Sequence, residues 1–291
     1  MVDIINSPIE NISFRDFDFL IKRDDLLHKS FSGNKARKFY YFLKKDFPNI
    51  TTVVSHGSNQ SNAMYSLSVL AKLKGWDYIY YTNHIPSFLQ ENPQGNYKYA
   101  LENGMKLRVG EYDFESIKVN RDDILYIDEG GAIEEAKYGL EILANEIKEY
   151  ISLNNIKDLK IFLPSGTGTT ALFLQIFLKD IKVLTCPCVG NSEYLRKQFL
   201  ELEPDETLHP TIVVLKKKYH FGKLYKENYE LYKQLLDETK IEFDLLYDPI
   251  GISTLMQNFP KNSKILYIHQ GGIIGNETML QRYKYKYDKI R

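Results

Sequence analysis

The sequence predicts an α/β protein built on mainly parallel β-sheets. From about residue 50 to the end of the chain, short apolar runs of strand length alternate with segments of helical periodicity. Strands that alternate with helices of this length are typical of parallel sheets, because the helices serve as the crossovers. With 291 residues, the chain is long enough to bury a sizeable core in one large domain or two ordinary ones.

The expected elements follow one another in this alternating order. The strands are apolar runs at 51–55, 77–81, 105–109, 124–127, 160–164, 181–185, 211–215 and 265–269. The helices have apolar residues at helical spacing and span 35–45, 60–74, 93–103, 133–150, 168–179, 191–200 and 225–239. No internal repeat or low-complexity linker is visible, so patterning alone sets no domain boundary.

Composition argues against several classes of partner. Lys plus Arg and Asp plus Glu both number 38, so the formal net charge is zero. A neutral chain is unlike proteins with a broad basic face for nucleic acid or acidic membranes. No stretch approaches the ~20 apolar residues that cross a bilayer, and the first residues lack a basic segment followed by an apolar run. We therefore expect a soluble, cytoplasmic protein with neither nucleic-acid nor membrane partners.

The two cysteines, Cys186 and Cys188, flank Pro187 after an apolar run. One residue of separation strains a mutual disulfide, and no Cys/His cluster with metal-ligand spacing accompanies them. We expect both to be core residues at the end of a strand, and we expect no metal site.

The most informative segment is 30–38, Ser-Phe-Ser-Gly-Asn-Lys-Ala-Arg-Lys. Residues 32–34 are of the types that begin helices, so Lys35 is expected in the first turn. The helix dipole is positive there and disfavours cations. The cluster of Lys35, Arg37 and Lys38 therefore indicates either an anionic or covalent partner, or a solvated basic helix start.

Three later segments each place polar residues or glycines beside an apolar run. Residues 55–62 read Ser-His-Gly-Ser-Asn-Gln-Ser-Asn, and residues 164–171 read Pro-Ser-Gly-Thr-Gly-Thr-Thr-Ala. Residues 265–272 form a strand that ends in His-Gln-Gly-Gly. The glycines and threonines of 165–170 suit a phosphate group at a helix N-terminus. This loop lacks the Gly-Lys-Ser/Thr of a Walker A motif.

In this order the four segments resemble the pyridoxal-phosphate-dependent family that includes 1-aminocyclopropane-1-carboxylate deaminase and D-cysteine desulfhydrase. That family belongs to the tryptophan-synthase-β-like enzymes, or fold type II. Lys-Arg-Asp-Asp-Leu-Leu at 22–27 and the Glu-Gly-Gly of 129–131 also match its pattern, so the likeness spans nearly the whole chain. Gly95-Asn96 and Asn103-Gly104 match it as well.

The resemblance implies two three-layer α/β domains with mainly parallel twisted sheets and the cofactor in the interdomain cleft. Residues 1–45 plus 151–291 would form the large cofactor-binding domain, and residues 46–150 the small one. The cofactor would be pyridoxal 5'-phosphate, the substrate a small amino acid, and the assembly a homodimer.

The resemblance also assigns roles near the cofactor. Lys35 would form a Schiff base with pyridoxal phosphate and move a proton at the substrate's α-carbon. Lys38, one turn further on the same face, would reach the phosphate, while Arg37 points elsewhere and is expected to be structural. The phosphate loop would consist of Gly166, Thr167, Gly168, Thr169 and Thr170.

The segment 58–62 would bind the substrate through Ser58, Asn59, Gln60, Ser61 and Asn62. In the family pattern Ser61 lies close to the substrate and is a catalytic candidate, and Asn62 hydrogen-bonds the cofactor's phenolic oxygen. The structural alternative is a serine or asparagine that caps the helix. Gln270 would lie near the pyridine nitrogen, where an amide can only hydrogen-bond and cannot act as a carboxylate does.

The chain departs from the family at a pattern written Asp-Pro-(Val/Ile)-Tyr-(Thr/Glu)-Gly-Lys. Here residues 248–254 read Asp-Pro-Ile-Gly-Ile-Ser-Thr, so Gly251 replaces the tyrosine and Ile252 the following residue. In the deaminase that tyrosine takes part in opening the cyclopropane ring, and the glutamate faces the pyridine nitrogen. Phe221 replaces a second family tyrosine. Candidates for the missing hydroxyl are Tyr247, Tyr219 and Tyr225.

These departures favour a D-cysteine desulfhydrase-like lyase that gives pyruvate, ammonia and sulfide. Elimination from cysteine needs only α-proton removal by Lys35 and a thiolate leaving group. Ring opening is more demanding, because the cyclopropane substrate has no hydrogen on its α-carbon. The alternatives are a 1-aminocyclopropane-1-carboxylate deaminase, which is a hydrolase, and a protein without turnover. The latter would be a catalytically degenerate cofactor binder or a nucleotide-binding α/β protein.

Overall fold

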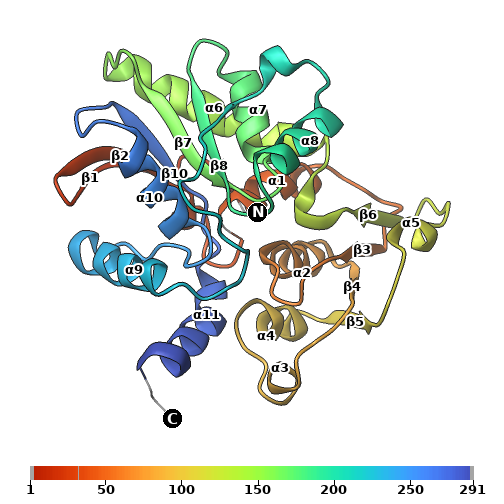
Figure 1. Ribbon diagram of the computed structural model, residues 1–291. Helices are drawn as coiled ribbons and strands as arrows, with labels where there is room; N and C mark the ends of the chain where they lie inside the picture. The colour runs from red at the N-terminus through yellow and green to blue at the C-terminus, as the bar shows by residue number, and fades with distance from the viewer. Residues whose placement is uncertain (1–2, 32, 289–291) are drawn as a thin grey trace.

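The computed structural model describes residues 3–31 and 33–288. Ser32, which we placed in the predicted helix start, lies outside the described residues. The chain forms two separate sheets, one of six strands and one of four, with helices packed against both (Figure 1). The α/β class with mainly parallel sheets is confirmed.

The six-stranded sheet has the order β1-β2-β10-β7-β8-β9, and all its pairs are parallel except β1 with β2. Alternate residues of β7 and β10 belong to two different core clusters. One cluster includes α6, α7 and α8, and the other includes α9 and α10, so helices cover both faces. The bounds are β1 Ile9–Phe14, β2 Phe17–Arg23, β7 Lys160–Ser165, β8 Val183–Pro187, β9 Thr211–Ile212, β10 Ile265–His269, α6 Ala136–Leu153, α7 Thr169–Phe177, α8 Ser192–Leu202, α9 Lys226–Thr239 and α10 Asp248–Asn258.

The four-stranded sheet is entirely parallel, in the order β5-β4-β3-β6. Helices α1, α2 and α4 share one core cluster with its strands. On the other face the short helix α5 stacks Phe114 on His56, with 3.9 Å between ring centroids. The bounds are β3 Thr52–His56, β4 Asp77–Thr82, β5 Met105–Val109, β6 Ile124–Ile127, α1 Gly33–Lys44, α2 Asn62–Lys74, α3 Ser87–Glu91, α4 Gly95–Glu102, α5 Phe114–Ile117 and α11 Asn276–Tyr283.

Most of the predicted elements are confirmed within a few residues. The strand predicted at 211–215 is shorter than expected, because pairing ends at Ile212. Helix α4 begins only at Gly95, two residues after Pro93. Both cysteines are buried and unpaired, as expected for core residues. Within the part of the chain that the structure describes, no helix is long and apolar enough to cross a membrane.

The domain boundaries at residues 46 and 150 stay a prediction. Helix α1 belongs to the predicted large domain by sequence, yet its side chains Phe39 and Phe42 lie in the same cluster as Val53 of β3. The helix also packs closely on α6, where a Cβ atom at Gly139 would lie 2.0 Å from the Arg37 carbonyl oxygen. Helix α1 therefore joins the cores of both sheets.

A buried network of ion pairs holds helix α1 in place. The guanidinium of Arg37 is fully buried and donates to both oxygens of Asp24, at 2.9 and 3.1 Å, and of Glu146, at 2.7 and 2.8 Å. Lys22 of β2 forms an ion pair with Glu146 at 2.6 Å. The network thus joins α1 to β2 and α6, and Arg37 is structural, as expected.

Removing one member of this network should destabilise the protein strongly. We expect Glu146→Gln to lower the free energy of unfolding by about 3 kcal/mol, because the buried cations of Arg37 and Lys22 lose their shared partner. Glu149→Gln, on the exposed side of the same helix, should change it by less than about 0.5 kcal/mol. Urea unfolding followed by circular dichroism measures both, and equal effects would show that the network carries no special weight.

Candidate active site

A cavity of about 410 Å³ lies where the carboxyl ends of strands from both sheets meet. Parallel sheets commonly bind ligands at this edge. The segments that follow β3, β6, β7 and β10 all contribute to its wall. The predicted residues that line it are Lys35, Lys38, Ser58, Gln60, Ser61, Asn62, Gly166, Thr167, Gly168, Thr169, Thr170 and Gln270.

Asn59 is the exception among the predicted site residues. Its amide donates to the carbonyl oxygen of His84 at 2.7 Å, and it is absent from the cavity wall. The side chain is used to connect two loops of the four-stranded sheet. The structure does not place Asn59 on the cavity wall, and its role in substrate binding stays a prediction.

Lys35 enters the cavity from the first turn of α1, as predicted. The end of β10 sets the position of this turn, because the Asn34 N–H donates to the Gln270 carbonyl oxygen at 2.9 Å. Gly33 has φ +67°, and a Cβ atom there would lie 2.0 Å from the same oxygen. A glycine is required at this junction.

Electrostatics at the start of α1 favour neutral amines. Burial lowers the pKa of Lys35 to about 8, against the opposing attraction of Asp244 and Glu129. Burial, and then the neighbouring Lys35, lower the pKa of Lys38 well below its ordinary value. The Lys38 Nζ donates to the Gly130 carbonyl oxygen at 3.1 Å, and neither lysine has a carboxylate within ion-pair distance among the described residues.

The loop between β7 and α7 has the features of an oxyanion site. Gly168 has φ +76°, and a Cβ atom there would lie 2.4 Å from the Phe199 ring, so the sharp turn needs glycine. The hydroxyl oxygen of Thr170 is buried and has no hydrogen-bond partner among the described residues. An unpartnered buried hydroxyl calls for a ligand. The first amides of α7 add further donors, and an anion is the natural occupant.

The segment after β3 combines a helix cap with a cavity wall. The Ser61 hydroxyl accepts from the N–H groups of Ala63 and Met64, at 3.1 and 3.4 Å, so the capping alternative is realised. The same residue lines the cavity. Asn62 accepts from the amide of Asn96 at 2.6 Å and hydrogen-bonds the carboxylate of Asp244.

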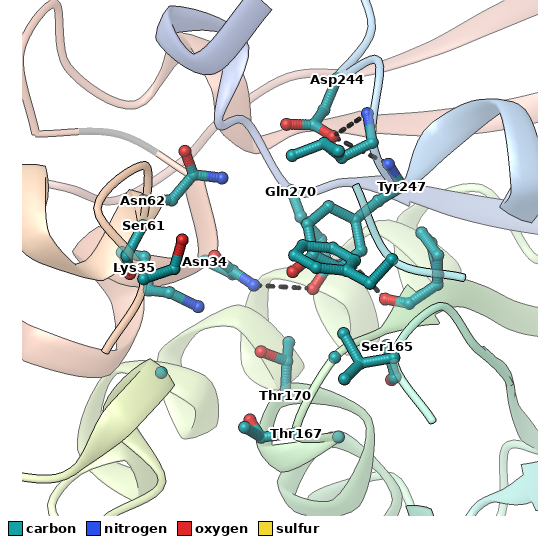
Figure 2. A pocket seen from close by; sticks show the side chains of 18 of the residues that line it. Asn34, Lys35, Ser61, Asn62, Ser165, Thr167, Thr170, Asp244, Tyr247 and Gln270 are labelled. Carbon is teal, nitrogen blue, oxygen red and sulfur yellow. Dashed lines mark hydrogen bonds between the residues drawn. The ribbon is translucent and has the colours of Figure 1, made fainter. Parts of the chain in front are cut away.

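Gln270 lies in the middle of the cavity wall with both ends of its amide engaged (Figure 2). Its nitrogen donates to the Pro164 carbonyl oxygen at 2.6 Å, and its oxygen accepts from the Asn34 amide at 3.0 Å. The side chain therefore holds the end of β10 against both β7 and α1.

Of the three tyrosines considered, Tyr247 alone lines the cavity, and its hydroxyl lies beside Gly166. Tyr219 and Tyr225 pack against each other, with 5.0 Å between ring centroids. Burial, and then Asp244, raise the pKa of Tyr247 above its ordinary value. A phenol of this kind donates hydrogen bonds and resists ionisation.

Sequence reasoning missed Asp244 altogether. Burial, and then the neighbouring Asp248, raise the pKa of this carboxyl to about 7. It stands alone in the apolar stretch 243–247, so no motif marked it. Its position on the cavity wall depends on the long-range packing of the segment before α10. Further polar residues of the wall, none with a predicted site role, include Asn34, Glu129, Tyr194 and Arg282.

The chain has the fold of several fold type II enzymes of known structure. An ACC deaminase homologue of known structure superposes with a TM-score of 0.78 at 23% identity, covering 98% of this chain and 95% of that chain. A hydrogen sulfide-producing enzyme from Fusobacterium nucleatum gives 0.67 at 15% identity, over 94% and 97%. A pyridoxal 5'-phosphate-dependent aspartate racemase gives 0.62 at 14% identity, over 91% and 90%.

Sequence comparison finds relatives that share one name. Proteins of Pyrococcus horikoshii and Pyrococcus furiosus, each named "Putative 1-aminocyclopropane-1-carboxylate deaminase", are 26% and 24% identical to the chain. Both alignments cover 286 residues, 89% of this chain and 85% of the relative. No family model matches the chain. The resemblance predicted from the motifs is confirmed.

The lowered pKa of Lys35 predicts unusual reactivity at moderate pH. Only the neutral amine reacts with an acylating reagent, so modification of Lys35 by acetic anhydride should rise with pH with a midpoint near 8. The same lysine in urea-unfolded chain should show a midpoint of about 10.4. Peptide mass spectrometry after trace labelling between pH 6 and 11 measures both. Coincident midpoints would contradict the burial of this amine.

Proposed function

We propose that the protein is a pyridoxal-phosphate-dependent lyase or deaminase of a small amino acid. The observation that carries this proposal is that Lys35 and the loop 165–170 line the same cavity. A buried lysine of lowered pKa, a second buried lysine and an unpartnered Thr170 hydroxyl suit an aldehyde that bears a phosphate. The residues present therefore fit this cofactor.

Pyridoxal phosphate, when bound, supplies an aldehyde carbon and an electron-withdrawing ring that stabilises negative charge at the substrate's α-carbon. The loop 165–170 and Lys38 would hold its phosphate, and Asn62 and Gln270 would face its ring. Lys35 would hold the cofactor covalently before substrate enters and would then act as the base. Since the pKa of Lys35 is about 8, about a tenth of these amines are neutral at pH 7.

The N-terminus of α2 is the proposed site for the substrate carboxylate. The Ser61 hydroxyl already accepts from two N–H groups of this helix, so the carboxylate would accept from that hydroxyl and from the Asn62 N–H at the positive end of the helix. A carboxylate held there would leave the α-carbon proton within reach of Lys35, and Ser58 and Gln60 would complete the wall.

Within this class we favour a D-cysteine desulfhydrase-like reaction. Lys35 would take the α-proton while the bond from the β-carbon to sulfur breaks and thiolate leaves, so that cysteine and water give pyruvate, ammonia and hydrogen sulfide. Ring opening in the family uses a tyrosine at the position of Gly251. A Cβ atom at Gly251 would lie 2.8 Å from the Tyr267 hydroxyl oxygen, which leaves no room for that side chain.

Cyclopropane ring opening is the second candidate, and one observation favours it. Tyr247, just before α10, places a phenol on the cavity wall. A hydroxyl is therefore present in the cavity although position 251 holds glycine instead of the family tyrosine. The names of the curated relatives point the same way. A nucleotide-binding protein is less favoured, because it gives Lys35 and residues 58–62 no role.

Cofactor binding should depend on Lys35. Protein incubated with pyridoxal phosphate should absorb in the 400 nm region, and borohydride treatment followed by peptide mapping should find the modification on Lys35. Lys35→Ala should abolish the covalent product. The Thr170→Val variant keeps the shape but removes the unpartnered hydroxyl, and it should weaken cofactor affinity by about tenfold. A colourless wild-type protein would contradict the proposal.

Activity should separate the candidate reactions. We expect wild-type holoenzyme to release pyruvate and sulfide from D-cysteine faster than it releases 2-oxobutanoate from 1-aminocyclopropane-1-carboxylate, with Lys35→Ala lowering turnover by at least about 10³-fold. L-Cysteine and D- and L-serine complete the screen. The opposite preference would assign the deaminase reaction, and no product from any of these compounds would indicate a protein without turnover.

A further inference from the structure

A buried carboxylate lies at the end of the cavity away from the threonine loop. Figure 2 shows Asp244 at the opposite side of the site from Thr167 and Thr170. Asp244 is 3% exposed, and one of its oxygens accepts from the N–H groups of Leu246 and Tyr247, at 2.8 Å each. These two bonds engage only Oδ1, so Oδ2 is available for another partner.

The second oxygen of Asp244 faces the amide of Asn62. Both atoms lie beside Gly272: a Cβ atom at this glycine would lie 2.4 Å from the Asn62 nitrogen and 2.9 Å from this oxygen. The carbonyl end of the Asn62 side chain accepts from Asn96 at 2.6 Å. One neighbour thus holds each end of the amide, and the NH2 end is the end turned toward Asp244.

The backbone around Asp244 is fixed as firmly as its side chain. The Asp244 N–H donates to Asp248 at 2.8 Å, and the Tyr267 hydroxyl donates to the other oxygen of Asp248 at 2.6 Å. Each oxygen of Asp248 therefore accepts one hydrogen bond from within the protein. Asp244 presents its carboxylate from the turn between α9 and α10, two helices that pack on the six-stranded sheet, while Asn62 begins α2, which packs on the four-stranded sheet.

We propose that Asp244 is a positioning residue that orients the Asn62 amide, so that one of its N–H groups binds Asp244 and the other points into the cavity. This inference rests on the proposed function, since the second N–H would donate to the phenolic oxygen of the cofactor. A carboxylate that accepts one N–H also strengthens the amide as a donor. The contact joins the two sheets across the site.

Several titratable groups interact electrostatically with Asp244. Lys35 of α1 faces it from the cavity, and Asp248 and Tyr247 lie on its own segment. Tyr232 of α9 and Cys188 after β8 complete the set. Among these groups Lys35 is the cation, so removal of the Asp244 charge should also make the Lys35 amine easier to deprotonate.

The test compares Asp244→Asn with the exchange Asp244→Asn/Asn62→Asp. In the single variant the NH2 group of the introduced amide would face the NH2 group of Asn62, so the hydrogen bond is lost. We expect this variant to weaken pyridoxal-phosphate affinity by about tenfold and to shift the visible absorption band of the holoprotein. The exchange restores the hydrogen bond and the contact with Asn96, yet directs no donor into the cavity. Its unfolding midpoint should return toward wild type while cofactor affinity and band position should not.

Two further variants complete the experiment. Asp244→Ala removes the oxygen without adding a donor, and it should change affinity and spectrum in the same direction, less strongly than Asp244→Asn. Asp237→Asn removes an exposed charge of α9 that pairs only with the surface residue Lys240 in the described structure, and it should change neither. Stability is followed by circular dichroism, and affinity by absorbance titration with pyridoxal phosphate.

The outcomes keep the two proposals apart. Wild-type affinity and spectrum in Asp244→Asn and Asp244→Ala would overturn the positioning role and leave the proposed function standing. Recovery of affinity together with stability in the exchange would make Asp244 merely structural and would also overturn the inference. If the wild-type protein takes up no pyridoxal phosphate, the proposed function fails and the inference falls with it.

Discussion

The burial of the Arg37 guanidinium is the constraint on which the active site depends. Arg37 lies two residues after Lys35, so the two side chains leave α1 in different directions. Asp24 and Glu146 hold the guanidinium in bidentate geometry, and rotation of the helix would leave a buried charge unpaired. That penalty is several kcal/mol, far more than any exposed lysine contact contributes. The direction in which Lys35 enters the cavity is therefore set by a contact on the far side of its helix.

The same helix carries two lysines into a place where neither has an ion-pair partner within residues 3–31 and 33–288. Burial lowers the pKa of both, and the nearby acids oppose this only for Lys35. An anion at the threonine loop would restore the balance for Lys38, and a covalent partner would remove the charge of Lys35 altogether. The cavity thus separates an electropositive end, with Lys38 and the α7 N-terminus, from an end with the buried carboxyl of Asp244. This polarity matches a ligand with a phosphate at one side and a ring oxygen at the other.

Local patterns predicted the parallel strands, the start of α1 and the threonine loop, because each has a strong signal in adjacent residues. The β1–β2 hairpin was missed because its turn, Arg15-Asp16, has positive φ values of 49° and 58° at residues that rarely adopt them. Asp244 was missed for another reason: only the packing of a distant turn brings it to the wall. Asn59 was assigned to the substrate together with its sequence neighbours, yet its amide donates to the His84 carbonyl oxygen and it does not line the cavity. Sequence neighbours share a loop, but they need not share a direction.

The departure from the family pattern at Gly251 has a structural reason that reaches the active site. Gly251 lies in the first turn of α10, and the missing side chain makes space for the hydroxyl of Tyr267. That hydroxyl donates to Asp248, which in turn accepts the N–H of Asp244, and the Asp244 carboxylate meets Asn62. A tyrosine at position 251 would displace Tyr267 and release this chain of contacts. Gly251 is thus physically linked to the turn that carries Asp244, because the space beside the glycine admits the hydroxyl that holds Asp248.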